Sequence, residues 1–183
     1  MQKIKSKFFV LLFILFFSCE NKTIRDQEGL IVYQENQISW IRNFEPLNPV
    51  SIPRWPTRGG IYESLYLNNP ITTDWVPWLA TNYKWENNNK KLLFTIRPNV
   101  QWSDGKPFSA HDVAYTLNLW NQYPALDTRN AWEYLKSVVA VSDTLVQIDF
   151  KRIYVPGFEA IAGAPIIPKH IWKELKDPLD FSN

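Results

Sequence analysis

Residues 92–120 constrain the fold more than any other part of this sequence. Their first section, residues 92–96, is a short apolar run that ends before Pro98, and such a run predicts a buried strand. Asp104 and Gly105 then form a turn signal, because glycine tolerates a positive φ and aspartate can bond its own backbone. The stretch therefore predicts a strand followed by a tight turn.

An amphipathic helix is expected directly after this turn. Ser109 stands three residues before Asp112, which is the spacing of a capping box with aspartate in place of the usual glutamate or glutamine. The helix should therefore begin at residue 110. Its apolar face, spaced at i, i+4 and i+7, comprises Val113, Leu117 and Trp120.

Two hairpins are expected on either side of this unit. Residues 87–89 are three asparagines, and they form a polar turn between residues 92–96 and an earlier strand that holds Tyr83 and Trp85. Further along, apolar and polar residues alternate over residues 144–150, which is typical of a half-buried strand. Its partner strand precedes the Ser-Asp pair at positions 142 and 143. Together these elements predict a compact domain of mixed helix and sheet.

The residues around the first turn also fit a family pattern. Residues 97–113 match R-x-x-V-x-W-x-D-G-x-P-[FV]-[ST]-A-x-D-V, and residues 165–172 read P-I-I-P-K-H-I-W. The chain thereby resembles the family 5 extracellular solute-binding proteins, the peptide, nickel and oligosaccharide receptors of ABC importers. The resemblance implies an α/β fold with mixed α+β lobes, in the class II two-lobed arrangement of periplasmic binding proteins. The motif itself is expected to build a turn and a helix cap.

The resemblance also divides the chain into parts. Residues 30–59 correspond to the first part of lobe I, residues 60–163 to lobe II, which is a small mixed domain, and residues 164–183 to a return into lobe I. Members of the family continue beyond the point that corresponds to residue 183. We therefore expect an N-terminal third of such a protein, either a fragment or a truncated reading frame.

Two further helices are expected from this resemblance. Residues 61–66 resemble the Y-E-x-L helix of the family, in which Leu65 packs into the core. Pro168 suits the first turn of a helix that reaches Leu175.

The first residues have the composition of an export signal. Three lysines precede an uninterrupted apolar run at residues 8–17. As a helix this run would rise only about 15 Å, roughly half of a bilayer core, so it predicts a signal sequence and not a membrane span.

Cys19, the only cysteine of the chain, follows this run as in a lipobox. We therefore expect a lipoprotein signal peptide at residues 1–18, a polar tether at residues 19–29, and acyl chains on Cys19 that anchor the protein to a membrane. The protein should then reside in the periplasm or at the cell surface. A plain signal peptide with an incidental thiol is the alternative.

The loop after the first strand of lobe I is the expected ligand surface. Prolines at positions 46, 49, 53 and 56 exclude a helix there and give the loop a fixed shape. Aromatic and guanidinium groups on such a loop can contact sugars or peptide planes, although the alternative is that some of them cap the core from outside. The candidate ligand-binding residues are Trp40, Phe44, Trp55, Arg58 and Tyr62.

Several functional classes are disfavoured. His111 and His170 are the only histidines, and they lack metal-ligand spacing, so neither a metal nor another cofactor is expected. Catalytic triads and phosphate-binding glycine motifs are missing, which argues against an enzyme. Removing the three N-terminal lysines from 20 basic residues leaves 17 against 18 acidic ones, and this balance gives no reason to expect nucleic-acid binding.

The sequence therefore predicts a membrane-anchored solute receptor that works with ABC permease subunits. Its solute is expected to be an oligopeptide or a similar molecule, and the 9 tryptophans also suit stacking on an oligosaccharide. A surface lipoprotein that binds glycan or protein without a transporter is the alternative. A hydrolase would need a catalytic group outside this sequence.

Overall fold

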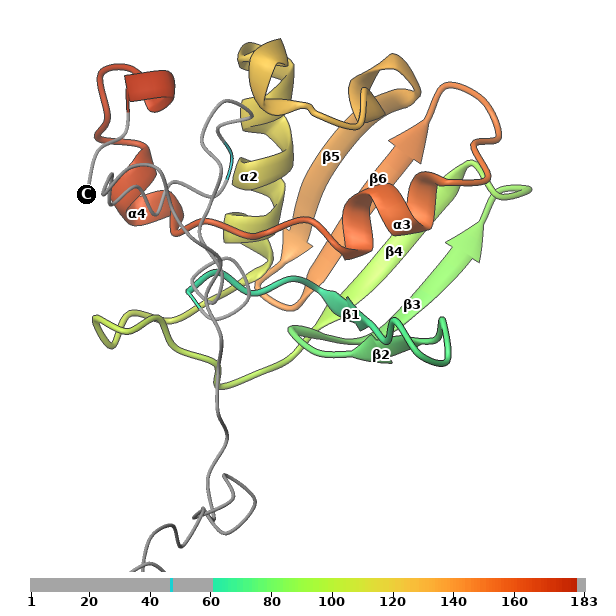
Figure 1. The fold of residues 1–183 in the computed structure, drawn as a ribbon, viewed down its shortest axis with the longest axis horizontal. Helices are drawn as coiled ribbons and strands as arrows, with labels where there is room; N and C mark the ends of the chain where they lie inside the picture. The colour runs from blue at the N-terminus through green and yellow to red at the C-terminus, as the bar shows by residue number, and fades with distance from the viewer. Residues whose placement is uncertain (1–46, 48–60, 181–183) are drawn as a thin grey trace, which may run out of the picture. The chain divides into compact units, whose positions relative to one another are not determined.

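A four-stranded antiparallel sheet organises the part of the chain that the computed structural model describes, which is Leu47 and residues 61–180. All of these residues belong to the second of two units, residues 38–183. The strand order is β3-β4-β6-β5, and helices α2 and α3 lie across one face of the sheet (Figure 1). The bounds are Ala80–Glu86 for β3, Lys91–Ile96 for β4, Leu135–Ser142 for β5, Leu145–Phe150 for β6, Ala110–Gln122 for α2 and Gly157–Ala162 for α3.

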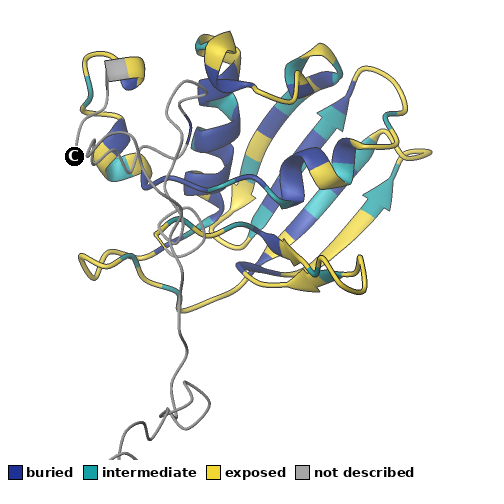
Figure 2. Cartoon of the chain, in the orientation of Figure 1, coloured by how far each residue is buried: buried dark blue, intermediate teal, exposed yellow. Residues whose placement is uncertain are grey.

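Both predicted hairpins are confirmed. The three asparagines at positions 87–89 have φ angles of 49°, 50° and 58° and join β3 to β4. The hairpin of β5 and β6 closes just after residue 142. Alternate side chains of β6 point into the core, because Val146, Ile148 and Phe150 are all buried. Figure 2 shows the same alternation as dark bands along the central strands.

The predicted helix cap of α2 is also confirmed. The Ser109 hydroxyl accepts a hydrogen bond from the His111 N–H at 3.2 Å, and the Asp112 carboxylate accepts one from the Ser109 N–H at 2.9 Å. The helix begins at Ala110 as expected. Its predicted apolar face is buried, with Val113 and Leu117 at 0% exposure.

A second, two-stranded sheet packs near α3 through aromatic rings. It pairs β1, Tyr66–Asn68, with β2, Trp75–Pro77. Phe158 of α3 contacts Tyr66 with ring centroids 5.3 Å apart, Trp75 at 5.6 Å and Tyr83 at 4.4 Å. Because Phe158 also stacks on Phe94 of β4, these rings tie the small sheet, α3 and the main sheet into one core.

Short helical turns complete the described chain. They are η4, Pro124–Leu126, η5, Ala131–Glu133, α4, Lys169–Trp172, and η6, Pro178–Asp180. Among the described residues, no helix has the length and the apolar content that crossing a membrane requires.

The helix expected at residues 61–66 is wrong, because residues 61–65 form bends and irregular backbone and Tyr66 begins β1. Its carbonyl groups bond distant amides and are not available to a helix: Glu63 O accepts the Ile166 N–H at 2.9 Å, and Leu65 O accepts the N–H groups of Trp78 and Ala80 at 3.0 Å each. Long-range pairing therefore overrides the local helical pattern. The predicted core position of Leu65 is nevertheless confirmed, since it is fully buried.

The helix expected from Pro168 to Leu175 is shorter than predicted. Pro168 is its N-cap residue with an extended backbone, and α4 ends at Trp172. Beyond that point the amides of Glu174 and Leu175 bond carbonyls three residues back, so the α-helical ladder gives way to tight turns.

Candidate ligand-binding site

Only one of the five candidate ligand-binding residues belongs to the described part of the chain. Trp40, Phe44, Trp55 and Arg58 lie outside it, as does Cys19. Tyr62 is described, and it lies in the irregular segment that leads into β1.

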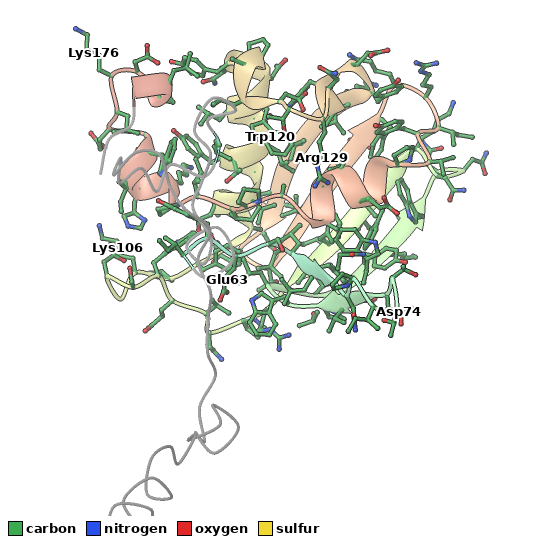
Figure 3. All side chains as sticks on the ribbon, viewed as in Figure 1. Glu63, Asp74, Lys106, Trp120, Arg129 and Lys176 are labelled. Atoms are coloured by element: carbon green, nitrogen blue, oxygen red, sulfur yellow. The ribbon has the colours of Figure 1, made fainter. Side chains whose placement is uncertain are left out.

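Tyr62 lies at a junction of two segments that are far apart in the sequence. It is half-buried and packs against the hydrophobic core. The carbonyl of the next residue, Glu63, accepts the N–H of Ile166, so the segment before β1 lies beside the segment after α3. Figure 3 labels Glu63 where these two segments run together. The packing of this ring against the core helps to fix its position.

Two buried polar side chains of α2 fix the second segment of this junction. The Thr116 hydroxyl accepts the Ile167 N–H at 3.1 Å, and Asp112 Oδ1 accepts the Lys169 N–H at 2.9 Å. Since Asp112 Oδ2 already accepts the Ser109 N–H, both carboxylate oxygens have a backbone donor. Asp112 is 5% exposed, so its negative charge depends on these hydrogen bonds in place of water. The capping residue of α2 therefore also positions α4.

The turn of the motif docks on α4 as well. Gly105 has a φ of +81°, and Asp104 Oδ1 accepts the Lys106 N–H at 3.1 Å. Asp104 Oδ2 lies 2.8 Å from His170 Nε2 and 3.7 Å from Lys106 Nζ. The Lys106 N–H is the main cause that lowers the pKa of the Asp104 carboxyl. Burial, the next largest effect, opposes it, and His170 lowers the pKa further.

Sequence reasoning placed Asp104 and Gly105 in a turn but missed its docking site. His170 follows Asp104 by 66 positions, and nothing in the local pattern of either residue indicates the other. The available signal for this contact was that Asp104 and His170 each lie in a stretch that matches the family pattern.

The contacts described for this junction hold backbone segments in position. Its contacts are hydrogen bonds that backbone amides donate to side-chain oxygens, together with the Asp104–His170 contact. Among the described residues, no three histidine, cysteine, aspartate or glutamate side chains are grouped so that they could hold a metal ion. The junction can thus fix the course of two segments and the position of Tyr62.

Comparison with known proteins gives a family match over most of the described chain. The family model described as "Bacterial extracellular solute-binding proteins, family 5 Middle" matches residues 74–183. The nickel-binding periplasmic protein of Escherichia coli is 31% identical over 132 residues, which are 68% of this chain and 24% of that protein.

Solved structures agree with this match. A periplasmic oligopeptide-binding protein of Thermotoga maritima, solved with bound mannohexaose, is 28% identical with a TM-score of 0.66, over 73% of this chain and 25% of that one. An oligopeptide-binding protein of Bacillus subtilis, solved with a nonapeptide, shares the fold at 22% identity and a TM-score of 0.66, over 79% of this chain and 29% of that one. These neighbours are two-lobed periplasmic binding proteins, which confirms the predicted fold class. The chain spans about a quarter of the length of these relatives.

Proposed function

Because the chain belongs to the family 5 extracellular solute-binding proteins of bacteria, we propose that it acts as an extracytoplasmic receptor of an ABC importer. In this role it binds an oligopeptide or a similar solute and delivers it to permease subunits. The observation that carries the proposal is the continuous family match of residues 74–183, which includes the whole main sheet and both motif segments. The family consists of solute-binding proteins, which are not enzymes.

The choice of solute class is supported by the relatives. The Bacillus subtilis neighbour was solved with a nonapeptide and the Thermotoga maritima neighbour with mannohexaose. Both ligands are linear chains of repeated units with many hydrogen-bonding groups. An oligopeptide is the leading candidate here, and an oligosaccharide is the second candidate because of the tryptophan content.

The proposed domain organisation assigns residues 30–59 to lobe I, residues 60–163 to lobe II and residues 164–183 to the return into lobe I. The contact between Glu63 and Ile166 supports these boundaries, since a chain that leaves and re-enters a lobe should do so through adjacent segments. Ligand binding between lobes then favours a closed state over an open one.

The proposed ligand surface is the proline-shaped loop with Trp40, Phe44, Trp55 and Arg58, together with Tyr62. Tyr62 supports this assignment through its place at the proposed boundary between lobes, where it is half-buried. A loop whose shape is fixed by prolines loses little conformational entropy when a ligand binds. Its aromatic contacts would therefore contribute to affinity with little entropic cost.

The proposed location is the periplasm or the cell surface, with an acyl anchor at Cys19. This part of the proposal is supported by the lysine-rich start, the short apolar run and the position of the single cysteine. Periplasmic relatives such as the nickel-binding protein of Escherichia coli are consistent with export.

A binding screen tests the proposed function. The protein is purified with any natural sequence that follows Asn183 included, and its melting temperature is measured with tri- to nonapeptides, neutral oligosaccharides and nickel–histidine. A ligand present at 100 times its Kd should stabilise the protein by about 2.7 kcal/mol, and calorimetry then gives its affinity. Uptake of that ligand should be lost in cells that lack the gene. Tight binding with unchanged uptake would favour the surface lipoprotein without a transporter, and a protein that binds no member of the screen would contradict the proposed solute classes.

A further inference from the structure

An apolar loop projects from the end of the main sheet that lies away from α4 (Figure 1). Residues 151–156 join β6 to α3, and within them Ile153 is 56% and Val155 is 88% exposed. The Phe150 N–H donates to the Lys90 carbonyl at 2.8 Å, so this loop begins beside the turn that joins β3 to β4. We propose that the loop and the lysines around it form a membrane-contact surface, which binds an anionic phospholipid bilayer.

Contacts of its polar and aromatic side chains fix the course of the loop. The Tyr154 ring stacks on Tyr134 with the centroids 3.8 Å apart and the planes at 4° to each other. The Arg152 guanidinium lies 4.7 Å from the centroid of the Tyr134 ring. Tyr154 is half-buried in this way, while the residues on either side of it, Ile153 and Val155, are exposed. The loop therefore presents two aliphatic side chains on a backbone that other residues hold in place.

Exposure of these two side chains does not by itself identify a partner. Neither Ile153 nor Val155 belongs to the hydrophobic core of the described chain. Single exposed aliphatic residues are common on protein surfaces, although their hydration is unfavourable. The charges around the loop therefore decide what kind of surface it fits.

The ends of four strands meet beside the loop. In the strand register Lys91 of β4 lies opposite Glu86 of β3 and Asp149 of β6, and Leu135 of β5 lies opposite Phe150. These ends contain six lysine and arginine residues against three aspartate and glutamate residues, which leaves a formal charge of +3. We call them the basic end of the sheet, and they comprise residues 84–91, 133–136 and 149–152.

Most lysines of the basic end are not neutralised by a neighbouring carboxylate. Glu86 pairs with Lys84 at 2.8 Å, and Glu133 pairs with Arg152 at 3.5 Å. In the described chain, the lysines of the basic end that form no ion pair are Lys90, Lys91, Lys136 and Lys151. The positive charge is therefore available to an anionic partner.

A bilayer fits this combination better than a protein does. Protein interfaces are depleted in lysine and depend on aromatic anchors in fitted pockets. An anionic bilayer attracts lysines without a fixed geometry, about fivefold in the binding constant for each cation near its surface, and its interface accepts aliphatic side chains. The proposed surface adds to the proposed location of the protein and does not depend on the transported solute.

Sedimentation with phospholipid vesicles tests the proposal. The protein begins at Glu20, so that neither the apolar N-terminal run nor an acyl chain contributes, and it includes any natural sequence that follows Asn183. Binding to vesicles of phosphatidylcholine mixed with phosphatidylglycerol should be at least about tenfold tighter than to phosphatidylcholine alone, and about 0.5 M NaCl should weaken it. Equal binding to both kinds of vesicle, or binding to neither, would overturn the proposal.

A serine pair tests the aliphatic contacts. Ile153→Ser combined with Val155→Ser should weaken binding to the mixed vesicles by about tenfold or more. Val139→Ser combined with Val141→Ser is the control, because these β5 valines are similarly exposed, at 50% and 55%. The control should bind like the parent, and melting curves by circular dichroism check that both variants are folded. Parent-like binding of the loop variant, or equal losses in the control, would contradict the assignment.

A glutamine pair tests the charges. Lys90→Gln combined with Lys136→Gln should weaken binding by about fivefold for each lysine removed. Lys173→Gln combined with Lys176→Gln makes the same change in net charge beyond the end of α4, where Figure 3 labels Lys176, and should have a smaller effect. Equal effects of the two pairs would show that net charge alone matters and that the basic end is not the contact.

Photo-crosslinking in cells separates a bilayer from a protein partner. A photoreactive amino acid is placed at position 155 of the full chain, and the crosslinked products are identified by mass spectrometry. Crosslinks to phospholipid would support the proposal. Crosslinks to one protein in place of lipid would overturn it.

Discussion

Asp112 Oδ1 accepts a hydrogen bond from the backbone N–H of Lys169 at 2.9 Å, although the two residues are 57 positions apart. The same carboxylate caps α2 through the Ser109 N–H. One buried side chain therefore sets both where α2 begins and where α4 packs against it.

Asp112→Asn should destabilise the protein strongly. The amide replaces one acceptor by a donor, so either the Ser109 or the Lys169 N–H loses its partner in a buried site. The expected cost is about 1–3 kcal/mol of the free energy of unfolding, measured by urea denaturation. Asp143→Asn is the control, because that side chain is 85% exposed, and its effect should remain within about 0.5 kcal/mol. Equal effects of the two substitutions would show that the contact with Lys169 contributes little.

Gly105→Val should lower stability without changing ligand affinity. Gly105 has a φ of +81°, while an added Cβ would meet nothing within 4 Å, so the cost is conformational and not steric. Valine in that region should cost about 1–3 kcal/mol, which a melting curve detects. Gly105→Asn should cost less, because asparagine tolerates a positive φ. Reduced affinity at unchanged melting temperature would instead place this turn in the ligand site.

Asp104→Asn should reduce stability near neutral pH and have less effect in acid. The Lys106 N–H, with help from His170, lowers the pKa of Asp104 below its ordinary value of 3.8. A carboxyl group with a lowered pKa contributes stability above its unfolded-state pKa, and this contribution is lost as the pH falls through the folded-state pKa. Urea midpoints of the parent and the variant, compared between about pH 6 and pH 2, should therefore converge below about pH 4. A gap that stays constant over this range would show that ionisation of Asp104 is not involved.

Replacing the aromatic candidates of the ligand surface should weaken solute binding. Trp40→Ala, Trp55→Ala and Tyr62→Ala are each expected to cost about 1–3 kcal/mol of binding, which is roughly five- to more than hundredfold in Kd by calorimetry. Trp85→Ala is the control, since this ring contacts Phe150 of the main sheet in a tilted arrangement, with the centroids 5.4 Å apart. Circular dichroism confirms that each variant is folded. Parent-like affinity in all three variants would mean that the solute contacts other residues.

Cys19→Ala should release the protein from the membrane. The parent is expected in the membrane fraction with an acylated N-terminal cysteine, because several acyl chains give stable anchoring. Mass spectrometry of the fractionated protein measures both properties. An unmodified and soluble parent would show that Cys19 is not a lipidation site.

Local patterns predicted the parts of this fold that depend on neighbours in the sequence. The capping box at Ser109 and the asparagine turn before β4 involve residues within a few positions of each other, so their geometry can be inferred from spacing alone. The non-helical path of residues 61–65 could not be inferred, because Glu63 bonds residue 166 and Leu65 bonds residues 78 and 80. Long-range pairing determines the conformation of such segments, and a short sequence pattern does not encode that pairing.

In the candidate site, too, the features set by neighbours in the sequence could be predicted and the contacts between distant residues could not. Tyr62 was proposed from its place beside a proline-rich loop, while the contacts that fix its surroundings, Thr116 with Ile167 and Asp112 with Lys169, join distant segments.

The adjacency of Glu63 and Ile166 has an evolutionary consequence. A stretch of chain whose two ends meet at one point can be spliced into a surface loop of a host protein without forcing apart the host residues on either side. Such a module can be gained, lost or exchanged as a cassette while the host retains its own shape. The region between these two residues has the adjacent ends that are typical of an inserted domain.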